Sequence, residues 1–271
     1  MNQSPEAPYA HETDGVRRQP VERPPEWPRV RENVPLAAPL RWLALGWGDL
    51  VASRFRGSFY GLVFALMGAS IAMIWRTQWQ LTMGLTAGFF LLGPFVCTGV
   101  YELSRQLERG EGRNLPASLT CWRRNISAIA FFAAILTFLM VVWARVSVVL
   151  FALASTSEYP TMRGMIGQIV SPTNIEFLLL WCTVGFVFAS LVFAISVVSV
   201  PLMLDRRTDT MMAIFTSARA LATNPGPVYL WALLIVALIG VSLVTWFWLL
   251  LITAPLVGHA TWHAYRALIE P

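Results

Sequence analysis

Long apolar runs separated by short charged segments occupy the chain from residue 57 onward. About 20 apolar residues in a helix cross the roughly 30 Å hydrocarbon core of a bilayer. The last run, 227–266, is too long for one ordinary span, and we divide it near Val241–Thr245, after Gly240. A single tilted helix there is the alternative. We expect an all-α polytopic transmembrane helical bundle of about six spans, at 57–76, 79–101, 126–149, 176–203, 227–243 and 246–266.

Three amphipathic stretches precede the odd-numbered spans. Residues 40–54 alternate apolar and charged side chains at helical spacing, and residues 115–124 and 209–227 behave similarly. Asp209 is a candidate N-cap for the third stretch. We interpret the three as interfacial helices that lie in the headgroup plane. The chain would then hold three hairpins, each preceded by an interfacial amphipathic helix. Alternatively, such lead-ins are ordinary features of inner-membrane proteins and indicate no repeat.

A proline recurs near the inner end of each even-numbered span. The three motifs are GPFV with Pro94, VPLM with Pro201 and APLV with Pro255. Proline removes a backbone donor and frees the carbonyl four residues earlier, which kinks a helix. The shared depth of the three prolines therefore predicts structural kinks and supports an internal repeat.

Composition agrees with a membrane protein. Apolar residues make up 56% of the chain and charged residues 13%, whereas soluble domains carry roughly 25% charged residues. Residues 1–35 differ, because they are rich in Pro, Arg and Glu and have no apolar core that could offset the entropy of ordering. We expect a disordered cytoplasmic tail over 1–35 and a membrane domain over 36–268.

Arginine distribution predicts the orientation. With a cytoplasmic N-terminus, the inner segments carry 17 arginines and the outer side carries two, Arg76 and Arg163. Cytoplasmic segments are enriched in basic residues. We therefore expect a multi-pass protein of the bacterial inner (cytoplasmic) membrane. The net charge of +5 does not indicate nucleic acid, because the arginines flank apolar runs.

Five polar residues follow the three prolines at equivalent positions. If the repeats surround a common axis, they converge at an inner vestibule. Imidazole and carboxylate groups would suit a divalent metal or a proton relay. The alternative is that polar side chains merely resume where helices leave the membrane. Apart from such a metal, we expect no cofactor. The five residues are Glu102, Asp205, Asp209, His259 and His263.

Arg145 is a charge within a predicted span. A charge in the bilayer is costly unless it is paired or reaches the interface. Glu176, at the outer start of the next span, is a candidate partner at similar depth. The two form an intramembrane charge pair, or Arg145 extends to the outer surface.

The second half of the chain resembles a known family. The resemblance rests on SVPLMLDRRTDTMMAIFTSARALATNPGPVYLWALLI and on APLVGHATWHAYRAL, and it extends over about 40–268. These stretches are similar to an uncharacterised family of bacterial integral membrane proteins, a domain of unknown function sometimes labelled cytochrome c oxidase subunit I-like. The resemblance implies six spans and no established activity. The oxidase label finds no support, because that enzyme needs six histidine ligands and only His259 and His263 lie near a membrane here.

No catalytic motif or phosphate-binding loop is present in the sequence. We therefore expect a non-enzymatic scaffold, assembly or envelope-associated factor. One alternative is a small transporter or channel for an apolar or lipid-like substrate, and another is a metal- or haem-binding protein that uses His259 and His263. The expected partners are the lipid bilayer and other membrane proteins, such as a respiratory complex.

Overall fold

The computed structural model describes residues 27–75, 79–154, 175–245 and 247–271. Arg76, Arg163, Trp246 and residues 1–26 therefore lie outside the described residues. Within the described ranges the chain is α-helical, with one isolated β-bridge between Val30 and Ile269. The elements are α1 (Ala38–Ser53), α2 (Phe55–Trp75), α3 (Trp79–Glu108), α4 (Leu115–Thr120), the 3₁₀ helix η1 (Cys121–Asn125), α5 (Ile126–Ala154), α7 (Ile175–Ser196), α8 (Ser199–Arg206), α9 (Thr210–Thr223), α10 (Pro225–Val244) and α11 (Leu250–Leu268).

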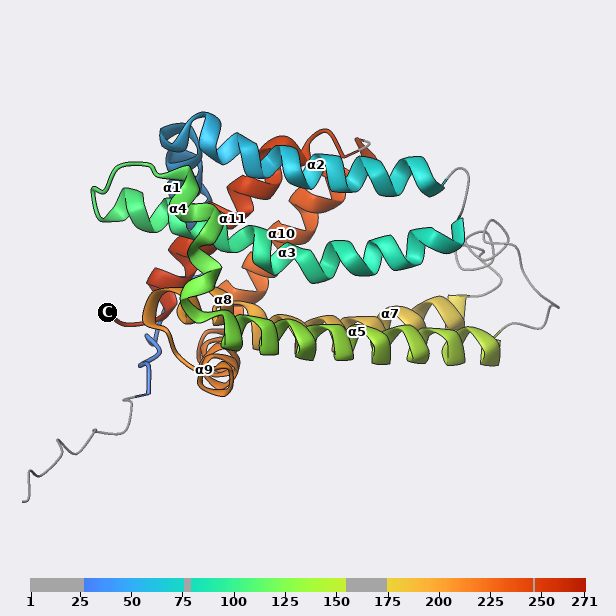
Figure 1. The fold of residues 1–271 in the computed structure, drawn as a ribbon. Helices are drawn as coiled ribbons and strands as arrows, with labels where there is room; N and C mark the ends of the chain where they lie inside the picture. Colours follow the sequence, from blue (N-terminus) through green and yellow to red (C-terminus); the bar gives the residue numbers. More distant parts are fainter. Residues whose placement is uncertain (1–26, 76–78, 155–174, 246) are drawn as a thin grey trace, which may run out of the picture.

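Four apolar segments of the described residues are long enough to cross a membrane. They are Arg56–Ile74, Leu115–Leu150, Ile175–Arg206 and Pro225–Val244. In Figure 1, α2, α3, α5 and α7 run side by side along the length of the molecule. The chain is thus helical with several membrane-spanning candidates, as the apolar runs predict. The apolar run over 227–266 is divided between two helices: α10 ends at Val244 and α11 begins at Leu250.

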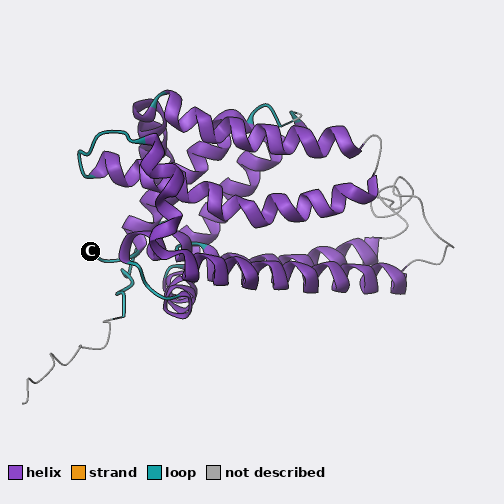
Figure 2. Cartoon of the chain, in the orientation of Figure 1, coloured by secondary structure: helices purple, strands orange, loops and turns teal. Residues whose placement is uncertain are grey.

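The shorter helices gather at one end of the long ones, as Figure 2 shows. We call this end the polar head; it comprises α1, α4, η1, α8, α9 and the C-terminal halves of α3 and α11. Side-chain caps begin two of its helices. The Asn114 side chain accepts from the Ala117 amide to begin α4, and the Asp209 side chain accepts from the Met212 amide to begin α9. The cap predicted at Asp209 is therefore present.

Helix α11 packs closely against α1 and α2 through glycines. A Cβ at Gly46 would lie 2.6 Å from the Ala260 amide nitrogen, and a Cβ at Gly61 would collide with the Leu251 carbonyl. Leu251 is four residues before Pro255, so its carbonyl has no helical amide to accept from. The Gly61 backbone therefore lies against the carbonyl that Pro255 leaves free, and a larger residue could not fit there.

The three predicted kink prolines occupy different positions. Pro94 and Pro255 lie inside the continuous helices α3 and α11. Pro201 instead follows a break, because α7 ends at Ser196 and α8 begins at Ser199. Ser217 of α9 stabilises this break: its hydroxyl donates to the Ala194 carbonyl at 2.7 Å and accepts from the Val198 amide at 3.3 Å.

Residues 27–35, the last part of the expected disordered tail over 1–35, form hydrogen bonds with distant parts of the chain. The Arg31 amide donates to the Leu268 carbonyl at 2.8 Å, and the Glu270 amide donates to the Arg29 carbonyl at 3.0 Å. Asn224 accepts from the Val34 amide and donates to the Arg31 carbonyl. These long-range bonds, together with burial of Val30, order a segment whose composition alone could not.

Candidate functional site

A chain of hydrogen-bonded polar side chains joins α1, α3 and α11 within the polar head. The Ser104 hydroxyl donates to Asp49 Oδ2 at 2.7 Å, and it also lies 2.7 Å from His259 Nδ1. His263 Nε2 lies 2.9 Å from the same oxygen of Asp49. Ser104 has one proton, which it gives to Asp49, so His259 must donate from Nδ1 to Ser104. A neutral His259 is therefore the Nδ1–H tautomer.

In that tautomer, the other ring nitrogen of His259, Nε2, carries a free lone pair. His259 is fully buried, and its Nε2 has no hydrogen-bond partner among the described residues. This atom faces α2, where a Cβ at Gly57 would lie 3.4 Å away. The Ser53 hydroxyl nearby donates to the Leu50 carbonyl, so it is not a donor to the imidazole. The opposite end of the chain is partly accessible, because Asp49 and His263 are each 19% exposed.

Glu102 forms a separate ion-paired cluster. Its carboxylate accepts from Arg105 at 2.7 and 2.8 Å and from Arg124 at 2.9 and 3.0 Å. Burial of Glu102 by itself would raise its pKa, but the hydrogen bonds and charges of the two arginines outweigh burial and lower the pKa below 4.5. Glu102 is thus an ionised, fully paired carboxylate that ties α3 to η1.

The remaining predicted ligands also have their own partners. Asp205 accepts from the Tyr265 hydroxyl at 2.9 Å and lies 3.4 Å from Arg109. Asp209 is occupied by its capping bond to Met212. Each carboxylate therefore already has a structural role in the polar head.

The five predicted ligands are consequently not brought together. His259 and His263 are linked through Asp49 and Ser104, whereas Glu102, Asp205 and Asp209 lie in three other interactions. Across the described ranges, no group of three or more His, Cys, Asp or Glu side chains is arranged to hold a metal ion. Asp209 lies beyond the end of α8 at Arg206 and caps α9, so the helical spacing that the sequence predicts does not continue from Asp205 to Asp209.

The sequence patterns did not identify Asp49 and Ser104 as site residues. Asp49 looks like one more charge on the polar face of an amphipathic helix, and Ser104 lies between two charged residues. Neither residue stands in a motif. Only the crossing of α1, α3 and α11 brings them to the histidines.

The predicted pair of Arg145 and Glu176 is not formed. Both residues are exposed, and the ion pairs of the described residues do not include one between them. Aromatic rings pack between α5 and α7 instead. Trp143 lies 5.9 Å from Trp181 and 5.4 Å from Phe188 between ring centroids.

Comparison with known proteins finds one family model that matches part of the chain. No curated protein and no solved structure matches the sequence. A family model described as "Predicted integral membrane protein (DUF2189)" matches residues 81–205, a narrower stretch than the resemblance over 40–268. Over residues 81–205, the chain matches a family of predicted integral membrane proteins of unknown function, which confirms the resemblance there.

Proposed function

We propose that this protein is a non-enzymatic scaffold or assembly factor of a bacterial inner membrane, with six spans and a cytoplasmic N-terminus. The order of elements supports three units, because a short element precedes two long ones each time: α1 before α2 and α3, α4 with η1 before α5 and α7, and α9 before α10 and α11. Leu40 and Trp47 of α1 and Phe215 of α9 are exposed, as expected for helices in the headgroup plane.

The orientation follows from charge. Arginine is concentrated in the polar head, and basic residues favour the cytoplasmic side. With the head inside, the long helices extend from it into the bilayer. The arginines of the head and its edge include Arg41, Arg54, Arg105, Arg109, Arg113, Arg123, Arg124, Arg206, Arg207, Arg219 and Arg266.

The exposed surface of α7 is the observation that carries the scaffold role. None of the residues of α7 is buried, whereas α11 buries most of its length. Phe186 and Val187 are 63% and 61% exposed on this helix. Apolar helices in lipid gain little from contacting more lipid, and close packing against another transmembrane helix stabilises them instead. The α5–α7 pair thus offers a face that its own bundle does not use.

The polar head supports a structural role for the buried polar groups. Glu102 is bound by two arginines, and Asp205 by Tyr265 and arginine. Paired, buried charges fix the arrangement of the elements that carry them. The head would hold the α5–α7 pair at a defined angle for a partner.

Site-specific photo-crosslinking tests this proposal. A photoreactive amino acid at Val187 of α7 should give one reproducible adduct to another membrane protein in intact cells. Val236 of α10 is the matched control, because it is a valine 67% exposed on an apolar helix. Adducts only to lipid at Val187, or the same adducts at both positions, would contradict the scaffold role.

A further inference from the structure

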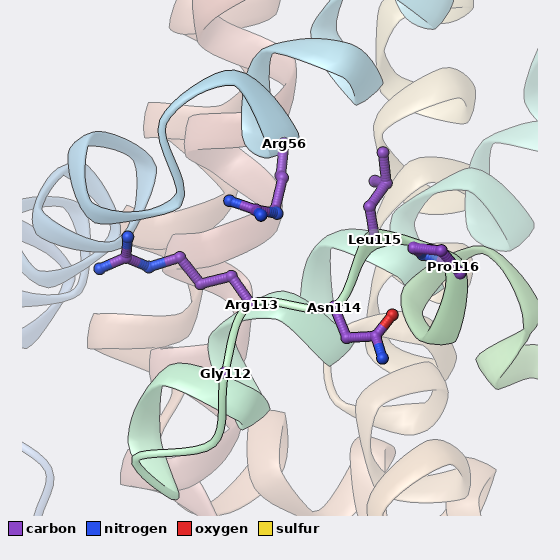
Figure 3. Close-up of a pocket in the computed structure, with 6 residues that line it drawn as sticks. All are labelled: Arg56, Gly112, Arg113, Asn114, Leu115 and Pro116. Atoms are coloured by element: carbon purple, nitrogen blue, oxygen red, sulfur yellow. The ribbon is translucent and has the colours of Figure 1, made fainter.

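Two arginines line a pocket at the edge of the polar head. Arg56 begins the apolar segment of α2, and Arg113 lies in the loop that leads to α4. The pocket has a volume of about 930 Å³, within the roughly 300–1,000 Å³ of ligand sites. In Figure 3, Arg56 comes from α2 and Arg113 from the loop, and their guanidinium groups lie on the same side of that loop.

Neither guanidinium is neutralised by a carboxylate of the described residues. Within the described residues, Arg56 and Arg113 form no ion pair, whereas Arg105, Arg109, Arg124 and Arg266 all do. Arg113 is exposed and Arg56 is partly buried. Two unpaired cations facing one pocket attract an anion, and planar guanidinium groups suit the oxygens of phosphate.

An apolar groove of about 490 Å³ is lined in part by the same helix, α2. Its walls come from α2, α3 and the α4–η1 segment, with Phe59, Val96 and Trp122 among them. On α2, Arg56 is followed at helical spacing by Phe59, Tyr60 and Val63, so the charged and apolar linings share one face. Leu115 of the pocket packs against the same buried cluster as Phe59 and Val96. Pocket and groove are therefore adjoining parts of one surface.

The groove is apolar even where it carries polar residues. The Tyr60 hydroxyl and the Ser118 hydroxyl are 2.7 Å apart and satisfy each other. The Trp122 indole donates to the Leu119 carbonyl. The polar atoms of these lining residues are thus occupied, and an occupant of the groove would meet hydrocarbon.

We propose that this surface binds an anionic glycerophospholipid of the surrounding bilayer. Its phosphate lies between Arg56 and Arg113, and one acyl chain lies in the groove against Phe59 and Val96. The position suits a lipid because Arg56 is the first residue of a membrane-spanning candidate, at the level of the headgroups, while the groove follows the span inward. Trp122, which has the Arg123 guanidinium 5.4 Å from its ring, stands at the same level, where tryptophan is favoured.

Native mass spectrometry of the purified full chain, titrated with phosphatidylglycerol or with phosphatidylcholine of the same acyl chains, tests the site. The protein should bind phosphatidylglycerol about tenfold more tightly than phosphatidylcholine, as two charge-assisted contacts allow. The R56Q/R113Q variant should lose this preference. The R207Q/R219Q variant should keep it, because it removes the same charge from exposed arginines elsewhere in the head.

Two further measurements test the acyl-chain groove and the lipid identity separately. Val63→Trp should fill the groove and weaken the binding of both lipids, although both arginines remain. Inorganic phosphate at millimolar concentration should not displace phosphatidylglycerol. Equal binding of the two lipids by the unchanged protein, equal loss in R207Q/R219Q, or displacement by inorganic phosphate would each overturn the lipid site. Unchanged binding by Val63→Trp would overturn the placement of the acyl chain.

Discussion

The imidazole of His263 lies 2.9 Å from the carboxylate of Asp49, a contact that joins the last helix of the chain to the first. The same carboxylate oxygen accepts from Ser104 of α3. One side chain of α1 therefore holds two other helices. The contact is partly shielded, because both members of the pair are only 19% exposed.

Asp49→Asn should destabilise the polar head. The amide cannot accept two strong hydrogen bonds as a carboxylate does, and a hydrogen bond to a charged group contributes about 1.5–3 kcal/mol. We expect the apparent Tm in mild detergent to fall by roughly 4–8 °C, measured by intrinsic fluorescence. Glu111→Gln, on an exposed carboxylate, is the control and should leave the Tm unchanged. Equal Tm values for D49N and the unchanged protein would show that the contact contributes nothing.

Acid should destabilise the protein through Glu102. The pKa of Glu102 is lowered in the folded state, so its contribution to stability is complete above the ordinary value of 4.5 and is lost as the pH falls towards the lowered value. The Tm should therefore decline below about pH 4.5. Glu102→Gln should lower the Tm at pH 7, because it leaves two arginines without their anion, at a cost of roughly 3 kcal/mol.

The same Glu102→Gln variant should show a weaker decline of Tm with acid, because the titrating group is gone. Thermal melts between pH 7 and pH 3 measure both effects. Glu111→Gln again serves as the control and should follow the unchanged protein. A variant whose pH profile runs parallel to that of the unchanged protein would place the acid sensitivity elsewhere.

Gly46→Val should disrupt the packing of α1 on α11, whereas Gly48→Val should not. A Cβ at Gly46 meets the Ala260 backbone at 2.6–2.9 Å, but a Cβ at Gly48 meets nothing within 4 Å. Both substitutions change helix propensity equally, since both positions lie inside α1. Overpacking costs about 1–3 kcal/mol. A lower Tm for G46V than for G48V is expected, and equal values would contradict the close approach of α1 and α11.

Asn224→Ala should release the segment over residues 27–35 without unfolding the bundle. It removes a bond to the Val34 amide and one to the Arg31 carbonyl. Limited trypsin digestion should then cut after Arg31 several times faster, followed by mass spectrometry. Thr223→Ala, at an exposed neighbouring position, should digest like the unchanged protein. If Arg31 is cut at the same rate in both variants, Asn224 does not hold the segment.

The apolar runs by themselves determine much of the helical content. A run such as 126–149 can satisfy its backbone in hydrocarbon only as a helix, so α5 follows from composition and length. Local chemistry likewise predicts the cap at Asp209, because a capping bond needs only neighbours in sequence. The apolar runs also predict an integral membrane protein, and the family match over 81–205 supports that prediction.

Tertiary structure alone decided which polar groups meet. Asp49 and His263 are 214 residues apart, and no local pattern distinguishes Asp49 from other charges on α1. The order of residues 27–35 likewise depends on Asn224, 190 residues beyond Val34. Periodicity and caps are properties of a few consecutive residues. Hydrogen bonds between distant helices depend on how α1, α3 and α11 cross, which the close contacts at Gly46 and Gly258 allow.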